Sequence, residues 1–188
     1  MSSLICGSIA YDTIMNFEGK FADQILPEQI HILNVAFLVP TMRREFGGCA
    51  GNIAYNLHLL GGDPIIMATV GGDCVPYMSH LNQLGIDATH IRQVDSAFTA
   101  QAMITTDQTN NQITAFHPGA MGESHLNQVA DVVSERSARS KGAVKFGIVA
   151  PDGRQGMWEH CHQLAQANIP FIFDPGQGLP MFNGPELL

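Results

Sequence analysis

Hydrophobic residues in this chain form two kinds of pattern, short continuous runs and runs spaced three or four positions apart. The continuous runs at 4–9 and 65–70 have the length of buried strands in a parallel sheet. Between them, apolar residues at positions 50, 53, 54, 57 and 60 follow the 3.6-residue period of an amphipathic helix. The other elements that such patterns predict are helices over 76–84, 126–137 and 157–167 and strands over 144–150 and 170–173. This alternation predicts an α/β fold.

Three further segments show the every-second-residue alternation that is typical of half-exposed strands. They lie near 11–18, 31–46 and 97–117, and the polar stretch 107–111 marks a hairpin within the third. The first two fall between the first buried strand and the first helix, so we expect them outside the main sheet. We predict that these segments form a small second sheet, the lid, over one end of the main sheet.

Two polar residues are predicted to cap helices. Asp73 precedes the helix at 76–84 and stands where an N-cap side chain would accept an amide hydrogen. Asn183 and Pro185 form a second helix-start signal close to the end of the sequence. A helix therefore begins where the sequence stops.

Charge and composition exclude several classes of function. The formal net charge is −8 with only nine Lys plus Arg, whereas nucleic acids are bound through clustered cations. A phosphate donor would then depend on backbone amides, a helix N-terminus and a metal ion. No apolar run approaches the roughly 18 residues of a membrane span, and the start lacks the order of a signal peptide. We expect a cytoplasmic protein with no nucleic-acid or membrane partner, and its scattered cysteines predict no metal site.

A glycine-rich segment lies at 46–52, with the sequence FGGCAGN, between a predicted strand and a predicted helix. Glycine allows a ligand to approach the backbone closely, and the helix that follows presents free amides at its start. A tight strand-to-helix turn without a ligand explains the same residues. No Lys follows as in a phosphate loop, and Phe46 breaks the GxGxxG pattern, so dinucleotide binding is disfavoured.

Taken in order with their surroundings, these glycines belong to a longer series of short motifs. The series consists of Gly7-Ser8 followed by Asp12, GGCAGN with its helix and LGG at 60–62, VGGD at 70–73, FHPGAM at 116–121 and DPGQ at 174–177. It resembles the PfkB carbohydrate-kinase family over all 188 residues, and within that family it looks closest to bacterial adenosine kinases built like ribokinase. The resemblance implies the N-terminal portion of a ribokinase-like three-layer α/β/α core, with a small β-sheet lid, as an incomplete kinase domain over 1–188.

The resemblance also implies roles for four residues at the sugar. Asp12 matches the carboxylate that binds two sugar hydroxyls, and Gly48 and Asn52 match the backbone and amide contacts to the sugar. Ser8 supplies the adjacent hydroxyl. Each has a purely structural alternative, because Asp12 would also suit a turn and Asn52 the first turn of a helix.

Two more residues match contacts to a base. Phe116 corresponds to an aromatic of the lid hairpin that covers the purine in adenosine kinases, where stacking can contribute roughly 1–3 kcal/mol. Gln177 falls where a polar contact to the base is expected. A lone Phe in a strand can also be a core residue, and this alternative stays open.

The family carries two motifs at its phosphate site, which are NxxE, which organises Mg²⁺ and phosphate, and GAGD, which carries the catalytic base. GAGD is absent from the 188 residues, and we expect both motifs beyond Leu188. Asp73 in GGD imitates the second motif but matches an early turn of the family, and His160 and His162 point to different faces of one helix. We therefore expect the base beyond Leu188, no catalytic residue and no metal site within the chain, and no activity from the chain alone.

The function implied for the full-length protein is transfer of a phosphoryl group from ATP, with Mg²⁺, to the 5′-hydroxyl of adenosine, as in purine salvage. The alternatives are a PfkB kinase acting on ribose, fructose or another nucleoside, and a truncated, non-catalytic nucleoside-binding module. The expected partners are a small nucleoside or sugar and a second copy of the chain, bound lid to lid.

Overall fold

A computed structural model describes residues 2–139 and 142–187. Its main sheet has five parallel strands in the order β5-β4-β1-β8-β9. Their bounds are Ser2–Cys6 for β1, Asp63–Gly71 for β4, Ile91–Val94 for β5, Phe146–Val149 for β8 and Phe171–Phe173 for β9. The predicted α/β fold is confirmed.

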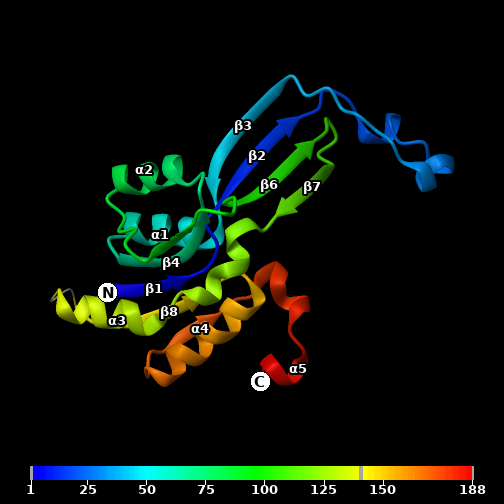
Figure 1. The fold of residues 1–188 in the computed structure, drawn as a ribbon. Helices are drawn as coiled ribbons and strands as arrows, with labels where there is room; N and C mark the ends of the chain where they lie inside the picture. Colours follow the sequence, from blue (N-terminus) through cyan, green and yellow to red (C-terminus); the bar gives the residue numbers. More distant parts are fainter. Residues whose placement is uncertain (1, 140–141, 188) are drawn as a thin grey trace.

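Helices cover both faces of this sheet (Figure 1). Helices α1 (Cys49–Leu59) and α2 (Val75–Gln83) pack on one face, and α3 (Val129–Ala138) and α4 (Arg154–Gln166) pack on the other. Successive residues of β1 point to opposite faces, so Ile5 lies in the core beneath α1 and α2 while Leu4 and Cys6 lie in the other core. Burial on both faces explains the continuous apolar runs in the sequence.

The lid is a separate four-stranded sheet in the order β3-β2-β6-β7. Its strands are β2 (Ala10–Asn16), β3 (Thr41–Gly47), β6 (Ala100–Thr106) and β7 (Gln112–His117). Strand β2 pairs antiparallel with β3 and parallel with β6, and β6 and β7 form the hairpin. Figure 1 shows the lid projecting from the body beyond the end of β1.

The lid differs from the sequence prediction between 31 and 40. The strand begins at Thr41, and 3-10 helices η1 (Phe21–Asp23) and η2 (Pro27–Ile32) precede it. Pro27 occupies the first helical position, where its fixed φ favours a helical turn. The rings of Phe17, Phe21 and Phe37 pack together with centroids 4.8–5.9 Å apart. This cluster holds the segment in place without strand pairing.

The remaining elements are short helical segments. They are the 3-10 helices η3 (Gly119–Leu126) and η4 (Gly176–Met181) and the short helix α5 (Gly184–Leu187). The helix predicted from 126 begins at Val129, because η3 occupies the preceding residues. At α5 the Glu186 amide donates to Asn183 Oδ1 at 3.1 Å, and the Asn183 amide donates to Glu186 Oε2 at 2.9 Å. The predicted capping role of Asn183 is confirmed. Asn183 and Glu186 also match the pattern NxxE, so the expectation that this motif lies beyond Leu188 is wrong.

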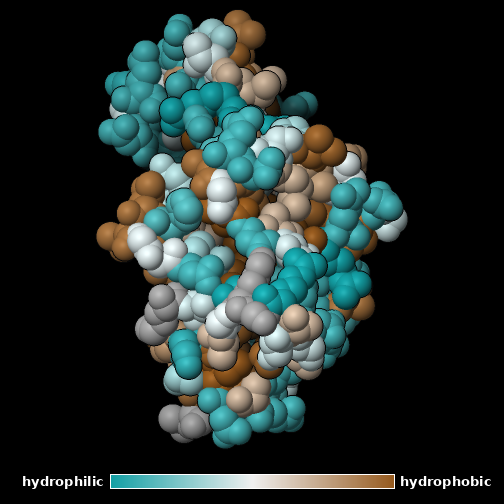
Figure 2. All heavy atoms as spheres, turned by 90° about the vertical axis from the view of Figure 1, so that its left-hand side faces the viewer, coloured by the Kyte–Doolittle hydropathy of each residue, from teal (hydrophilic) through white to brown (hydrophobic). Residues whose placement is uncertain are grey.

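The surface mixes apolar and polar residues. Figure 2 shows apolar residues interspersed with hydrophilic ones over the face that carries the left side of Figure 1. Within the described residues, no helix has both the length and the apolar character needed to cross a bilayer.

Candidate functional site

The carboxyl ends of β1, β8 and β9 meet at one edge of the main sheet, and the chain after β1 passes from there into the lid. Ser8 connects three elements at this edge. Its amide donates to the Pro151 carbonyl after β8 at 3.1 Å, and its own carbonyl accepts from Ala50 at 3.0 Å. Its hydroxyl accepts from the Cys49 amide at 3.1 Å. Ser8 thus fixes the start of α1, which is a structural use of its side chain.

Gly48 precedes α1 in a conformation that other residues rarely adopt. Its φ is +90°, and a Cβ there would lie 2.5 Å from the Ser8 carbonyl oxygen and 2.6 Å from the Ala10 amide nitrogen. Its carbonyl accepts from the Asn52 amide at 3.1 Å in the first turn of α1. The glycine therefore lets the lid strand β3 turn directly into the helix, and leaves Asn52 exposed at this end of it.

Asp12 lies on β2 beside the same turn. Gly47 leaves room for its carboxylate, since a Cβ at Gly47 would overlap both carboxylate oxygens. Burial raises the pKa of Asp12, and the negative charge of Glu45 on β3 raises it further. The structure therefore brings Asp12, Gly48 and the first turn of α1 together, as the sequence predicted.

Strand register places a second set of residues on the face of the lid that carries Asp12. Asp12 is paired with Ala102 on β6, and Ala102 is paired with Phe116 on β7. Paired residues of neighbouring strands share one face, and strands lie about 4.8 Å apart, so Asp12 and Phe116 stand roughly 10 Å apart with only a methyl group between them. A ligand that contacts both side chains would have to extend along this row.

Phe116 is 52% exposed. The core alternative for this residue is therefore wrong, and its ring is free to contact a ligand. Ala102 was not singled out from the sequence, because a small residue in a strand carries no signal until the register is known. Ala102 is 9% exposed, so neighbouring groups cover its methyl group, but a larger side chain there would stand between Asp12 and Phe116.

Gln177 lies in η4, directly after β9, at the same edge of the main sheet. The turn before it is fixed by Gly176, whose φ is +50° and whose amide donates to Asp174 Oδ1 at 3.1 Å. The Gln177 side chain is exposed. A contact between Gln177 and a base stays a prediction.

Two further carboxyl groups stand at this edge, Asp152 after β8 and Asp174 after β9. Burial raises the pKa of the Cys49 thiol at the start of α1, and the nearby charges of Asp174, Asp152 and Asp12 raise it further. Asp152 is only 4% exposed, its Oδ2 has no hydrogen-bond partner, and burial raises its pKa to about 8. The sequence signal for these two residues is their position one to three residues after a strand.

The predicted capping role of Asp73 is wrong. Asp73 Oδ1 accepts from the Thr99 amide at 2.7 Å, and the N-cap of α2 is Cys74. The carboxylate therefore links the turn after β4 to the Thr99 amide just before β6, where the chain enters the lid.

His160 has a structural position. It is fully buried, with Nε2 3.3 Å from the Asn127 carbonyl.

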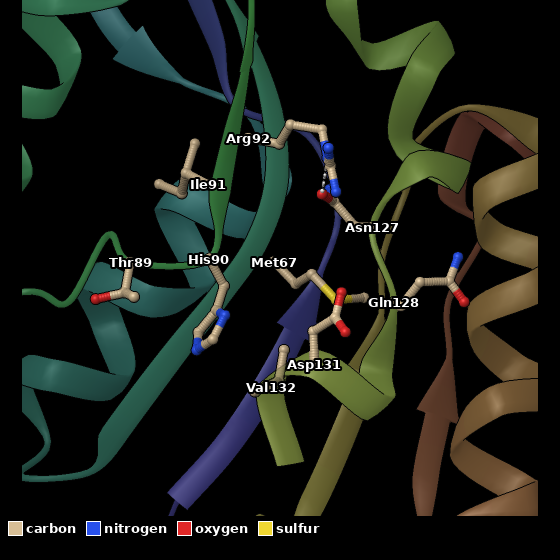
Figure 3. A pocket seen from close by; sticks show the side chains of 9 residues that line it. All are labelled: Met67, Thr89, His90, Ile91, Arg92, Asn127, Gln128, Asp131 and Val132. Atoms are coloured by element: carbon tan, nitrogen blue, oxygen red, sulfur yellow. Dashed lines mark hydrogen bonds between the residues drawn. The ribbon is translucent and has the colours of Figure 1, made fainter. Parts of the chain in front are cut away.

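Two hollows lie on the body, and the second borders Glu45, the cross-strand partner of Asp12. One, of about 260 Å³, lies between β5 and α3, and Figure 3 shows Arg92 and Asn127 joined across it by a hydrogen bond of 3.0 Å. Arg92 also donates to the Leu126 carbonyl at 3.0 Å, so its guanidinium is engaged in structural contacts. A second hollow, of about 290 Å³, lies between α1 and α2 and borders Asn52 and Tyr77. No group of three or more His, Cys, Asp or Glu residues within 2–139 and 142–187 is arranged to hold a metal ion.

Comparison with known proteins identifies the family. The family model for pfkB family carbohydrate kinases matches residues 12–180. The chain belongs to the PfkB family. The resemblance found in the sequence is confirmed, and with it the ribokinase-like fold.

Solved and curated PfkB relatives place the chain more closely. A structure of Burkholderia thailandensis nucleoside kinase in complex with inosine is 56% identical, with a TM-score of 0.78 over 98% of this chain and 56% of that one. The nucleoside kinase of Methanocaldococcus jannaschii is 30% identical over 100% of this chain and 56% of that protein. Its crystal structure has a TM-score of 0.76 to this chain. The chain thus spans about half the length of these PfkB relatives.

Proposed function

We propose that the full-length protein is a nucleoside kinase that transfers the γ-phosphoryl group of ATP to the 5′-hydroxyl of a purine nucleoside, with adenosine as the acceptor. The observation that carries this proposal is the row of Asp12, Ala102 and Phe116 on one face of the lid. It combines a carboxylate, a small buried residue and an exposed ring on one face of the lid.

The ribose end of the row has the chemistry for a diol. An ionised carboxylate only accepts hydrogen bonds, so Asp12 can accept from two neighbouring hydroxyls at once. Asn52 offers both a donor and an acceptor, and Gly48 allows the sugar to approach the backbone. These roles need no rearrangement of α1, because Gly48 is its N-cap and Asn52 already stands in its first turn.

The base end of the row favours a nucleoside over a free sugar. The exposed ring of Phe116 can stack on a purine base. A free sugar has no base to stack on this ring. Adenosine and inosine differ in the group at C6, an amine or a carbonyl, and the amide of Gln177 can accept from the first or donate to the second. The inosine complex of the Burkholderia kinase supports a purine nucleoside as the ligand class.

ATP and Mg²⁺ are the donor and the metal that this family implies. Bound Mg²⁺ would neutralise charge on the transferring phosphate. The GAGD motif is not among the 188 residues, so we assign the catalytic base to the rest of the full-length protein, whereas Asn183 and Glu186 match the NxxE pattern that organises Mg²⁺ and phosphate in the family. The residues described above bind and orient the acceptor.

We further propose that two copies pair through the lid face opposite Asp12. This face carries Met42, Met103 and Ile113, which are 70%, 44% and 46% exposed. Sedimentation of the full-length protein should show a dimer that the double variant Met42→Asp and Ile113→Asp converts to a monomer. The variant Leu59→Asp, on exposed α1, should leave the dimer intact.

Thermal unfolding of the full-length protein tests the acceptor class. A ligand raises the melting temperature only if it binds the folded state more strongly than the unfolded one. We expect adenosine or inosine to raise it well above the effect of ribose or fructose at equal concentration. A larger effect from a free sugar would identify the protein as a sugar kinase instead.

A further inference from the structure

The hydroxyl of Tyr77 contacts the glycine-rich turn at both of its ends. Tyr77 is the third residue of α2, and its hydroxyl donates to the Gly47 carbonyl at 2.7 Å. It also packs against the first turn of α1 so closely that a Cβ at Gly51 would overlap it. Since Gly48 lies between these two contacts and Asn52 follows directly, a single hydroxyl fixes the segment that carries both.

The same hydroxyl acts indirectly on Asp12. Gly47, whose carbonyl Tyr77 holds, is the residue whose missing side chain leaves room for the Asp12 carboxylate. A rotation of the Gly47 peptide would therefore move the backbone atoms beside the Asp12 carboxylate. Tyr77 thereby connects to Asp12, Gly48 and Asn52 without being one of them.

Tyr77 is itself held rigidly. Its amide donates to the Tyr11 hydroxyl at 3.3 Å, and that hydroxyl donates to the Asp73 carbonyl at 3.1 Å. Its ring, which is 2% exposed, lies 5.8 Å from that of Tyr11 and 5.1 Å from that of Phe46, centroid to centroid. These contacts come from β2, β3 and the turn before α2, so the hydroxyl is fixed relative to both the lid and the body.

We propose that Tyr77 is a positioning residue for the acceptor: its hydroxyl sets the Gly47 peptide and the first turn of α1 so that Asp12, Gly48 and Asn52 face the acceptor together. This inference rests on the proposed nucleoside kinase function. It assigns no contact between Tyr77 and the nucleoside, and no effect on ATP.

Steady-state kinetics of the full-length Tyr77→Phe variant tests the proposal. The ring packing is kept and only the hydrogen bond to Gly47 is lost, so we expect the KM for adenosine to rise about tenfold while the KM for ATP is unchanged. The matched control is Tyr55→Phe, which removes a hydroxyl from an exposed ring on α1. A purely structural role would lower the melting temperature and leave the KM for adenosine unchanged.

Gly51→Ala approaches the same contact from the other side. Alanine forms helix better than glycine, but its methyl group would displace the Tyr77 hydroxyl, so we expect the KM for adenosine to rise here too. In the double variant, loss of the Tyr77 hydroxyl makes room for that methyl group. The fold increase in the KM for adenosine should then be smaller than the product of the fold increases in the two single variants. A fold increase in the double variant equal to that product would overturn the proposal.

The outcomes separate this proposal from the proposed function. If the wild-type protein phosphorylates adenosine and both single variants keep its KM, the positioning role is wrong and the kinase function stands. If the wild-type protein phosphorylates no nucleoside, the proposed function is wrong and the inference is overturned with it.

Discussion

The carboxylate of Asp12 stands at the junction between the lid and the main sheet, half-buried and opposite Glu45. Burial and this neighbouring charge raise its pKa, so the ionised form is less stable than in water. Two sugar hydroxyls would restore the hydrogen bonds that water supplies to the free carboxylate. This environment supports the proposed contact between Asp12 and a diol.

Replacing Asp12 by Ala in the full-length protein should weaken adenosine binding by about 2–4 kcal/mol, because two charge-assisted hydrogen bonds are lost. Isothermal titration calorimetry measures the change. Asp23→Ala, which removes an exposed carboxylate from η1, is the control and should bind normally. Wild-type affinity in the Asp12 variant would remove this residue from the site.

Asp152 makes stability depend on pH. Burial raises its pKa to about 8, against 3.8 for an ordinary Asp. Between these values the folded chain holds a proton that the unfolded chain has released, so the free energy of unfolding falls as pH rises through this window. The slope contributed is about 1.4 kcal/mol per pH unit at most.

Asp152→Asn does not titrate and keeps an oxygen for the Gly153 amide. We expect its melting temperature, relative to the wild type, to improve steadily between about pH 5 and about pH 8. Asp174→Asn, an exposed site at the same edge, should show no such trend. A difference that stays constant with pH in the Asp152 variant would contradict the account.

Among the elements, those with a strong local pattern could be predicted from the sequence. The glycine-rich turn and α1 carry their own signals, in the glycines at 47, 48 and 51 and in the period of the apolar residues after them. The segment from 31 to 40 could not be predicted, since its conformation depends on Pro27 and on rings that meet only in the folded lid. Asp73 was misread for the same reason, because its partner Thr99 is distant in sequence.

The candidate site was predictable residue by residue but not as a surface. Motif resemblance pointed to Asp12 and Phe116 separately. That they share one face, with Ala102 between them, follows from strand register, which a one-residue slip would reverse. Sequence patterns alone do not fix that register across three strands.

Filling the gap between Asp12 and Phe116 should block the nucleoside. We expect Ala102→Leu to weaken adenosine binding at least about tenfold, since a leucine would occupy the space between ribose and base. Ala115→Leu adds the same side chain on the opposite face of the lid, at an exposed position, and is the control for binding. Because Ala102 is buried, the melting temperatures of both variants are measured to separate lost binding from lost stability. Calorimetry compares the two, and equal affinities would show that the nucleoside does not lie along this row.

At the scale of the whole molecule, the described part ends in an exposed sheet edge. Strand β9 pairs only with β8, and Ile172 on it is more than half exposed. An edge of this kind favours pairing with further strands. The relatives, of which this chain covers 56%, have additional sequence.

The 188-residue chain purified alone should show no measurable ATP-dependent phosphorylation of a nucleoside or sugar. Loss of a positioned base and of an anion-binding site each commonly costs about 10²–10⁴-fold in rate. An assay with radiolabelled ATP, run beside the full-length protein and free of host kinases, measures this. Activity that co-purifies with the short chain and is lost in Asp73→Asn would show that Asp73 is the base after all.

Phosphorus NMR can show whether the full-length protein phosphorylates the 5′-hydroxyl of a purine nucleoside. The products are those formed from ATP and an equimolar mixture of adenosine, inosine, ribose and fructose. We expect a nucleoside 5′-monophosphate as the main new phosphate ester, and loss of that product in Asp12→Ala. A sugar phosphate as the main product, or no phosphate ester from a folded preparation, would show that the protein is not a nucleoside kinase.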